Sequence, residues 1–342
     1  MKSDRGVLHE VLSRALDTKR TEQLFSVLVV PASLAKESGP RVSRAVLSQA
    51  LNMVLFEDLL ERVPAAKVYV DRCLQQGKTV MHDHGAVRTV ALAGMGGLPA
   101  GQEAITRLLR PLGYELNGTY PLERLRMTGR SYAQKDFPEE IAQFFISELH
   151  PERFSETFQE TVARVTGTSR DPLTPRAVIL LAEIEKRGSL SVDEAAEVLP
   201  VLAGCFARQH GDVSLKDYEA LLAESPEMAW ISTEGNAFNH ATDRVADVDA
   251  LAAEQKALGQ PMKDAVETSQ SGRVRQTAFR AAQVTRRFRG SDGGVVEKTV
   301  PGSFYEFITR LQMPEEDGKK KLDLSFDSSN AQAIFQMTAS AK

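Results

Sequence analysis

Two stretches of this chain, "HDHGAVRTVAL" at residues 82–92 and "NHATDRVADV" at residues 239–248, share one pattern. Each has a histidine followed four residues later by an arginine: His84 with Arg88, and His240 with Arg244. Both stretches contain β-branched residues in short runs, which is typical of strands. The repeat predicts two equivalent strands in two halves of one fold.

The order of elements after each stretch is also repeated. The first stretch is followed by a predicted helix, with Pro99 near its start and Gly113 just past its end, and then by strands. The second is followed by a predicted helix with Asp247 as its N-cap, and again by strands. The predicted strands are "LERLRMTGRSYAQ" (122–134) and "IAQFFISEL" (141–149) in the first copy, and "VRQTAFRAAQVTRRF" (274–288) and "SFYEFITRL" (303–311) in the second. We therefore predict an α+β fold in which two βαβββ modules form one half-barrel cleft.

Helical segments flank the two modules. Apolar residues recur at helical spacing in "VLHEVLSRAL" (7–16) and "LSQALNMVLFEDLLERV" (47–63). Later, Thr174 and Pro175 predict a helix start, and Ser191 with Glu194 predicts a capping box. These signals divide the chain into an N-terminal helical segment (1–76), a first module (77–151), a helical insert (152–228) and a second module (229–342). The two modules are expected to form one core.

Composition excludes several classes of protein. The net charge is −4, and 42% of residues are hydrophobic and 26% charged, as in ordinary globular proteins. There is no basic stripe with interleaved aromatic residues, so nucleic acid is not an expected partner. No apolar run approaches the roughly 20 residues of a membrane span, and the N-terminus lacks the apolar region of a signal peptide. The two cysteines, Cys73 and Cys205, argue against a disulfide framework and favour a cytoplasmic location.

The last strand of each module suggests a third site residue. Matching "FISEL" (145–149) with "FITRL" (307–311) makes Phe144 the counterpart of Glu306. On that alignment the cleft contains His84, His240 and Glu306, with apolar Phe144 in the fourth symmetric place. Two histidines and one carboxylate with open positions beside them are typical of non-heme Fe(II) sites that use O2. Structural roles for the histidines remain the alternative.

The arginines and a third histidine add weaker candidates. Arg88 lies about 13 Å along the same strand face from His84, where its guanidinium would pair with the far carboxylate of a dicarboxylic substrate. Arg244 would do likewise, or would pair with Asp243 or Asp247. His82 precedes His84 by two residues, so on a regular strand it shares the same face and becomes a weaker metal-ligand candidate.

Asp83 is a candidate for a supporting role. A carboxylate beside a metal-binding histidine commonly accepts a hydrogen bond from the second ring nitrogen and so orients the ring. An exposed loop position is the equally acceptable alternative for Asp83.

Five stretches together resemble a known family, the hydroxyglutarate synthase (2-oxoadipate dioxygenase/decarboxylase) family of the vicinal oxygen chelate, or glyoxalase-like, superfamily. They are "DHGAVRT" (83–89), "NAFNHATDR" (236–244), "VRQTAF" (274–279), "VPGSFYEFITR" (300–310) and "FDSSNAQAIFQMT" (326–338). The resemblance implies Fe(II) ligands at His84, His240 and Glu306, and a substrate-binding, catalytic arginine at Arg88. It implies O2-dependent decarboxylation of a 2-oxo acid; for 2-oxoadipate the products are 2-hydroxyglutarate and CO2, a step of lysine breakdown.

Gln276 and Ser303 lie in these matching stretches, so both are candidates for contacts with the substrate or with the metal ligands. Ala241 and Asp243 depart from the family pattern of leucine and proline around the second histidine, which leaves the choice of 2-oxo acid open. Two other functions stay open: a glyoxalase-type lyase or isomerase using Ni or Zn with a fourth protein ligand, and a non-catalytic small-molecule-binding module. The expected partners are a 2-oxo acid and O2, and the oligomeric state is undetermined.

Overall fold

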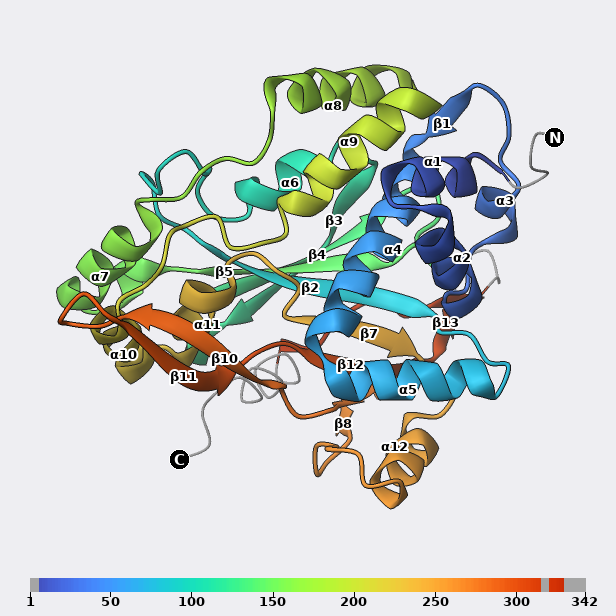
Figure 1. Cartoon of the computed structure of the whole chain (residues 1–342). Coiled ribbons are helices and arrows are strands. Elements are labelled where there is room, and N and C mark those ends of the chain that lie inside the picture. The colour runs from blue at the N-terminus through green and yellow to red at the C-terminus, as the bar shows by residue number, and fades with distance from the viewer. Residues whose placement is uncertain (1–5, 315–319, 329–342) are drawn as a thin grey trace.

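The computed structural model describes residues 6–314 and 320–328, and its centre is an eight-stranded sheet (Figure 1). The strand order is β3-β4-β5-β2-β7-β12-β9-β8. The first half contains β2 (His82–Val90), β3 (Tyr114–Leu122), β4 (Met127–Gln134) and β5 (Gln143–Leu149). The second half contains β7 (His240–Arg244), β8 (Glu267–Thr268), β9 (Val274–Ala278) and β12 (Phe304–Arg310). Each half has the same order outward from its first strand, which confirms the predicted pair of βαβββ modules.

The two modules meet where β2 and β7 pair antiparallel, with Gly85 opposite Ala241. The last strand of each module runs parallel to its first strand, β5 beside β2 and β12 beside β7. Helix α6 (Glu103–Leu109) follows β2, and α12 (Val248–Ala257) follows β7. Gly85 is required at the centre, because a Cβ there would lie 2.2 Å from the Phe238 ring.

The N-terminal helices cover one face of the sheet. They are α1 (Val7–Ala15), α2 (Thr18–Val27), α3 (Ala32–Ala35), α4 (Arg44–Arg62) and α5 (Pro64–Gln75). Figure 1 shows α4 and α5 in front of the central strands, and α4 contacts β2 and β7 while α5 contacts β12. Buried aromatic residues fill the space between them; Phe56 of α4 packs on Tyr305, and Tyr69 of α5 packs on Phe307. The alternate residues of the same strands therefore face the opposite side, where the cleft lies.

The helical insert consists of α7 (Glu156–Thr166), α8 (Pro175–Arg187), α9 (Val192–Gly204), α10 (Leu215–Glu224) and α11 (Pro226–Glu234). Its predicted caps are present: Thr174 caps α8, and Ser191 with Glu194 forms the capping box of α9. Strand β1 (Arg41–Ser43) pairs with β6 (Ser189–Ser191) and ties the insert to the N-terminal segment. Because α11 runs across residues 228 and 229, we propose that the insert ends at Glu234.

Three sequence-based boundaries were wrong. The strand predicted over 122–134 begins only at Met127, because Glu123–Leu125 forms a 3-10 turn. The strand predicted over 274–288 is two strands: β9 ends at Ala278, and β10 (Gln283–Arg289) leaves the main sheet to pair with β11 (Val295–Pro301). The helix predicted from Pro99 begins only at Glu103, because Gly101 has φ +60°, outside the helical region. A short hairpin of β13 (Gln312–Pro314) and β14 (Lys320–Leu322) follows β12, and two 3-10 turns lie at Glu123–Leu125 and Pro151–Arg153.

Among the described residues, no helix is long and apolar enough to cross a membrane.

Candidate metal centre

Three buried side chains converge on the face of the sheet away from α4 and α5. His84 comes from β2, His240 from β7 and Glu306 from β12. The Nε2 atoms of the histidines are 3.4 Å apart, and Glu306 Oε2 lies 3.4 Å from His84 Nε2 and 3.1 Å from His240 Nε2. Ligands about 2.1 Å from one metal ion lie about 3.0 Å apart at octahedral angles and about 3.4 Å apart at tetrahedral angles. The three atoms are therefore spaced as ligands of a single cation.

Two of the three donors, His240 and Glu306, have the protonation that a cation requires. Burial would lower the pKa of the third, His84, but its contacts with Asp83 and Glu306 outweigh burial and raise that pKa. Burial lowers the pKa of His240, which leaves that ring neutral with a free lone pair. Burial alone would raise the pKa of Glu306, but the neighbouring His240 and His84 outweigh it and hold that pKa at about 2. Glu306 Oε1 and His240 Nδ1 are buried without hydrogen-bond partners among the described residues. An ionised carboxylate buried with an unsatisfied oxygen fits a site built for a positive ion.

His84 is oriented from behind by Asp83. His84 Nδ1 donates to Asp83 Oδ1 at 2.8 Å, which directs Nε2 toward the other two ligands, as the sequence had suggested. Arg310 donates to both oxygens of Asp83 at 2.9–3.1 Å, and Arg244 Nε donates to Asp83 Oδ2 at 2.7 Å. Burial would raise the pKa of Asp83, but Arg310 and Arg244 outweigh it and hold that pKa well below its usual range. Asp83 is thus a charged, fully buried anchor for the ring.

Arg88 lies farther along β2, buried on the same face as His84. Its guanidinium carbon is 4.8 Å from the centre of the Trp230 ring. Burial lowers the pKa of Arg88 to about 10, and nearby Glu227 opposes that shift, so the side chain stays charged at neutral pH. Its positive charge reaches the site, since it helps to lower the pKa of His240. Ser147, opposite Arg88 on β5, lines the cavity beside the candidate ligands.

The cavity next to the three ligands is small, about 30 Å³. Gln276 lines it, as the sequence had suggested. Its apolar wall comes from Phe145 of β5 and Phe326, whose rings lie 4.9 Å apart. The remaining lining residues are Ala86, Ser147, Asn239 and Asp327.

The fourth symmetric place is taken by Phe145, so the assignment to Phe144 was wrong. Thr242 pairs with Glu306 in the second module, and the equivalent Ala86 pairs with Phe145 in the first. Phe144 instead points to the helix-covered face, where its ring packs on Phe238. Aligning the two similar sequences "FISEL" and "FITRL" had shifted the strand by one residue. A shift of one residue moves every side chain of a strand to the opposite face of the sheet. The place is nevertheless apolar, as expected.

His82 and Ser303 lie elsewhere. A β-bulge between His82 and His84 places His82 opposite Asp243 and turns its ring into the core, 5.2 Å from the Phe56 ring. The inference that His82 shares the face of His84 was therefore wrong. Ser303 Oγ donates to the Phe238 carbonyl at 2.7 Å and accepts from Arg62, and it does not line the cavity.

Arg244 is occupied by structural contacts rather than by either acid expected from the sequence. Besides Asp83, it donates to the Glu139 carbonyl at 2.8 Å. Asp243 accepts instead from Tyr69 Oη at 2.7 Å and from the Met81 backbone N–H at 3.0 Å.

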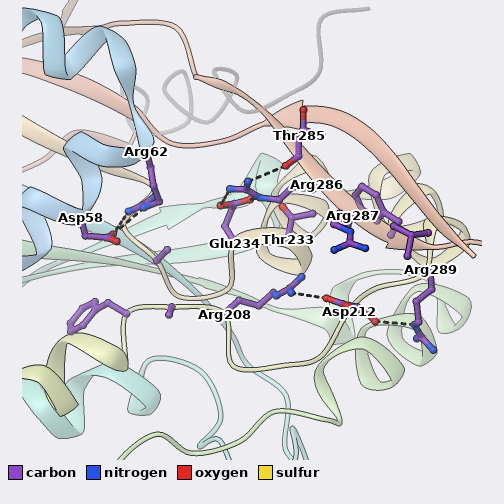
Figure 2. Close-up of a pocket in the computed structure, with 15 residues that line it drawn as sticks. Asp58, Arg62, Arg208, Asp212, Thr233, Glu234, Thr285, Arg286, Arg287 and Arg289 are labelled. Carbon is purple, nitrogen blue, oxygen red and sulfur yellow. Dashed lines mark hydrogen bonds and ion pairs between the residues drawn. The ribbon is translucent and has the colours of Figure 1, made fainter.

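A much larger cavity, about 570 Å³, lies away from these residues beside the β10–β11 hairpin (Figure 2). Its wall is rich in arginine, but Figure 2 shows that several of these arginines are already paired. Arg62 pairs with Asp58, Arg208 with Asp212 and Arg286 with Glu234. None of the three candidate ligands lines it, so the chemistry rather than the size of a cavity identifies the candidate centre.

A sequence model of the 2-oxoadipate dioxygenase/decarboxylase family matches residues 49–341. The chain belongs to this family. A solved glyoxalase superfamily protein from Ralstonia eutropha JMP134 is 56% identical, with a TM-score of 0.89 over 94% of this chain and 98% of that chain.

Two more distant relatives are also similar to this chain, and the solved one shares its fold. Hydroxyglutarate synthase from Oryza sativa, solved in complex with 2-oxoadipate, is 17% identical with a TM-score of 0.68, over 92% of this chain and 95% of that chain. The chloroplastic 2-oxoadipate dioxygenase/decarboxylase of Arabidopsis thaliana is 22% identical over 96% of this chain and 85% of its own.

Sequence reasoning missed several residues of the site. Thr242 lies 3.0 Å from Glu306 Oε2 and 3.1 Å from His84 Nε2, and Arg310 holds Asp83. Arg310 is the last residue of "VPGSFYEFITR", and Phe326 is the first residue of "FDSSNAQAIFQMT". Their place in these two stretches, which resemble the family, was the only sequence signal for either residue. Residues 329–338 of the second stretch lie outside the described residues.

Proposed function

We propose that this chain is an Fe(II)-dependent dioxygenase that decarboxylates a 2-oxo dicarboxylic acid, with 2-oxoadipate as the substrate. The convergence of His84, His240 and Glu306 beside an apolar fourth place carries the proposal. Family membership supports it, and the Oryza sativa relative was solved with 2-oxoadipate. The reaction balances as 2-oxoadipate plus O2 giving 2-hydroxyglutarate plus CO2. We propose that it serves lysine breakdown in the cytoplasm; both cysteines are free, which suits a reducing compartment.

In this proposal His84, His240 and Glu306 would hold the iron, which when bound supplies the redox chemistry with O2 and polarises the 2-oxo acid. Thr242 fixes one oxygen of Glu306, and Asp83 fixes the ring of His84. Arg88 would pair with the distal carboxylate and so present the substrate in one orientation.

Three further wall residues complete the proposed site. Phe145 and Phe326 would present an apolar wall to the bound acid. Gln276 of β9 would present its side-chain amide to the bound acid.

The rival with a fourth protein ligand is disfavoured by one observation. A redox-inactive lyase or isomerase of the glyoxalase type would need a donor atom in the place where Phe145 lies. Phenylalanine has none, so that side of the centre stays open for substrate and O2.

The test is O2 uptake after anaerobic loading with Fe(II). A series of C4 to C7 2-oxo acids, each with and without a distal carboxylate, is added to the loaded protein. The expected result is one O2 consumed and one CO2 released per turnover, fastest with a dicarboxylic acid. Absence of O2 uptake with every acid would contradict the proposal, and turnover without O2 with Ni or Zn would favour the lyase or isomerase.

A further inference from the structure

Residues 323–327, here called the strap, cross from the end of the second module to the first. At one end, the Asp323 backbone N–H donates to the Leu311 carbonyl at 3.1 Å. In the middle, the Leu324 carbonyl accepts from Asn117 and Gln143 of the first module at 3.2 and 3.3 Å. The strap therefore joins both halves of the sheet on the cleft side.

The strap forms one wall of the candidate metal centre. Phe326 and Asp327 line the cavity. The Phe326 ring meets the ring of His84 edge to face, with centroids 4.8 Å apart, and its backbone N–H donates to Tyr120 Oη at 3.1 Å. The position of the strap thus decides how the cavity is closed above His84.

The guanidinium of Arg310 binds both the strap and Asp83, the residue that orients His84. Arg310 directs Nε and Nη2 to Asp83, and Nη1 to the carbonyls of Asp323 and Ser325, each at 2.8 Å. Its guanidinium carbon also lies 4.9 Å from the Phe326 ring centre. The Arg310 side chain is fully buried, and a guanidinium is planar and rigid. Movement of either set of partners would therefore strain or break the hydrogen bonds to the other set.

We propose that Arg310 is a positioning residue that couples closure of the strap to the placement of His84. A cation that binds the aligned ring then stabilises the closed strap, and the closed strap strengthens cation binding by the same factor. This inference rests on the proposed role of His84 as a metal ligand.

One substitution should weaken the contacts of the strap without changing the contacts of Asp83. Arg273 donates to Asp323 Oδ2 at 2.8 Å and does not contact Asp83. Its side chain is 40% exposed, so Arg273→Met should weaken the strap with little effect on folding. Arg275→Met is the matched control: that side chain is also 40% exposed, but it pairs with Asp249, away from the strap.

The experiment combines Co²⁺ titration, followed by visible absorption, with hydrogen exchange of peptides that cover the strap. In the wild type and in Arg275→Met, Co²⁺ should slow strap exchange by about 5- to 150-fold, the usual range of coupling between two sites. Arg273→Met should exchange faster without metal and keep that slowing. Arg310→Lys keeps the positive charge but loses the planar guanidinium that binds both sets of partners. This variant should bind Co²⁺ about 10- to 100-fold more weakly and lose most of the slowing of strap exchange by Co²⁺.

Three outcomes would overturn the inference. The first is a wild type that binds Co²⁺ while its strap exchanges unchanged, a result that does not depend on any variant folding. The second is Arg310→Lys with undiminished slowing at saturating Co²⁺. The third is a wild type that binds no Co²⁺, and this outcome alone also contradicts the proposed metal site, so the two failures are distinguishable.

Discussion

Replacing His240 by alanine should abolish the stabilisation of this protein by metal. A cation at 100 times its dissociation constant stabilises the native state by about 2.7 kcal/mol. At about 2.1 cal/mol/K per residue, 342 residues give an unfolding entropy of about 0.7 kcal/mol/K, so metal should raise Tm by about 4 °C. Loss of a supporting residue costs 10- to 100-fold in affinity, and loss of a direct ligand should cost about 100-fold or more. His240→Ala should then gain under about 1 °C at the same metal concentration.

The assay is thermal unfolding of each protein in chelator and in Co²⁺ under anaerobic conditions. Comparing each variant with itself removes the stability change that the substitution causes without metal. His82→Ala is the control, because His82 is also a buried histidine of β2 but lies against Phe56 on the other face. It should keep the full shift of about 4 °C. A full shift in His240→Ala, or no shift in His82→Ala, would refute the assignment of the ligands.

Three further outcomes are expected. Arg88→Met should lower the preference for 2-oxoadipate over 2-oxohexanoate in kcat/KM by about 10- to 100-fold, the value of a hydrogen bond to a charged group, and an unchanged ratio would exclude the assigned role. His82→Leu should raise the free energy of unfolding in urea by about 1 kcal/mol, because both ring nitrogens are buried without hydrogen bonds of standard geometry; a loss of that size would count against this reasoning. Burial raises the pKa of Asp243 to about 6 in the folded state, so the folded protein keeps a proton there that the unfolded chain releases near pH 4. The free energy of unfolding of the wild type relative to Asp243→Asn should therefore fall by up to about 3 kcal/mol from pH 4 to pH 6.5 and then level off, whereas a pH-independent difference in urea titrations would contradict it.

Local signals in the sequence predicted much of the fold. Side chains such as those of Thr174 and Ser191 cap a helix through contacts three residues away, so their effect is readable from neighbours in the chain. The duplication was readable because both modules repeat the same order of helix and strands. His84 and His240 were found because they lie on the equivalent first strands of the two modules. Glu306 was found because it lies on the last strand of the second module.

The errors arose where distant contacts decide the face of a strand. Nothing in the letters around His82 reveals the bulge that turns its ring into the core, because the bulge exists only relative to β7. Phe144 was chosen over Phe145 because strand register depends on pairing with β2 rather than on similarity between two distant strands. The contact of Arg310 with Asp83 joins positions 227 residues apart, a separation at which a single sequence carries no pairwise signal.

The pairing of β2 with β7 fixes when the candidate centre can come into existence. His84 and His240 are 156 residues apart, and Glu306 follows still later. A chain growing from its N-terminus thus carries one of the three donors through the synthesis of the entire first module and the insert, and folding tends to proceed in that direction. A growing chain that has not yet reached β7 lacks two of the three candidate ligands. If the centre binds a cation as proposed, loading would follow the pairing of two strands whose histidines are 156 residues apart.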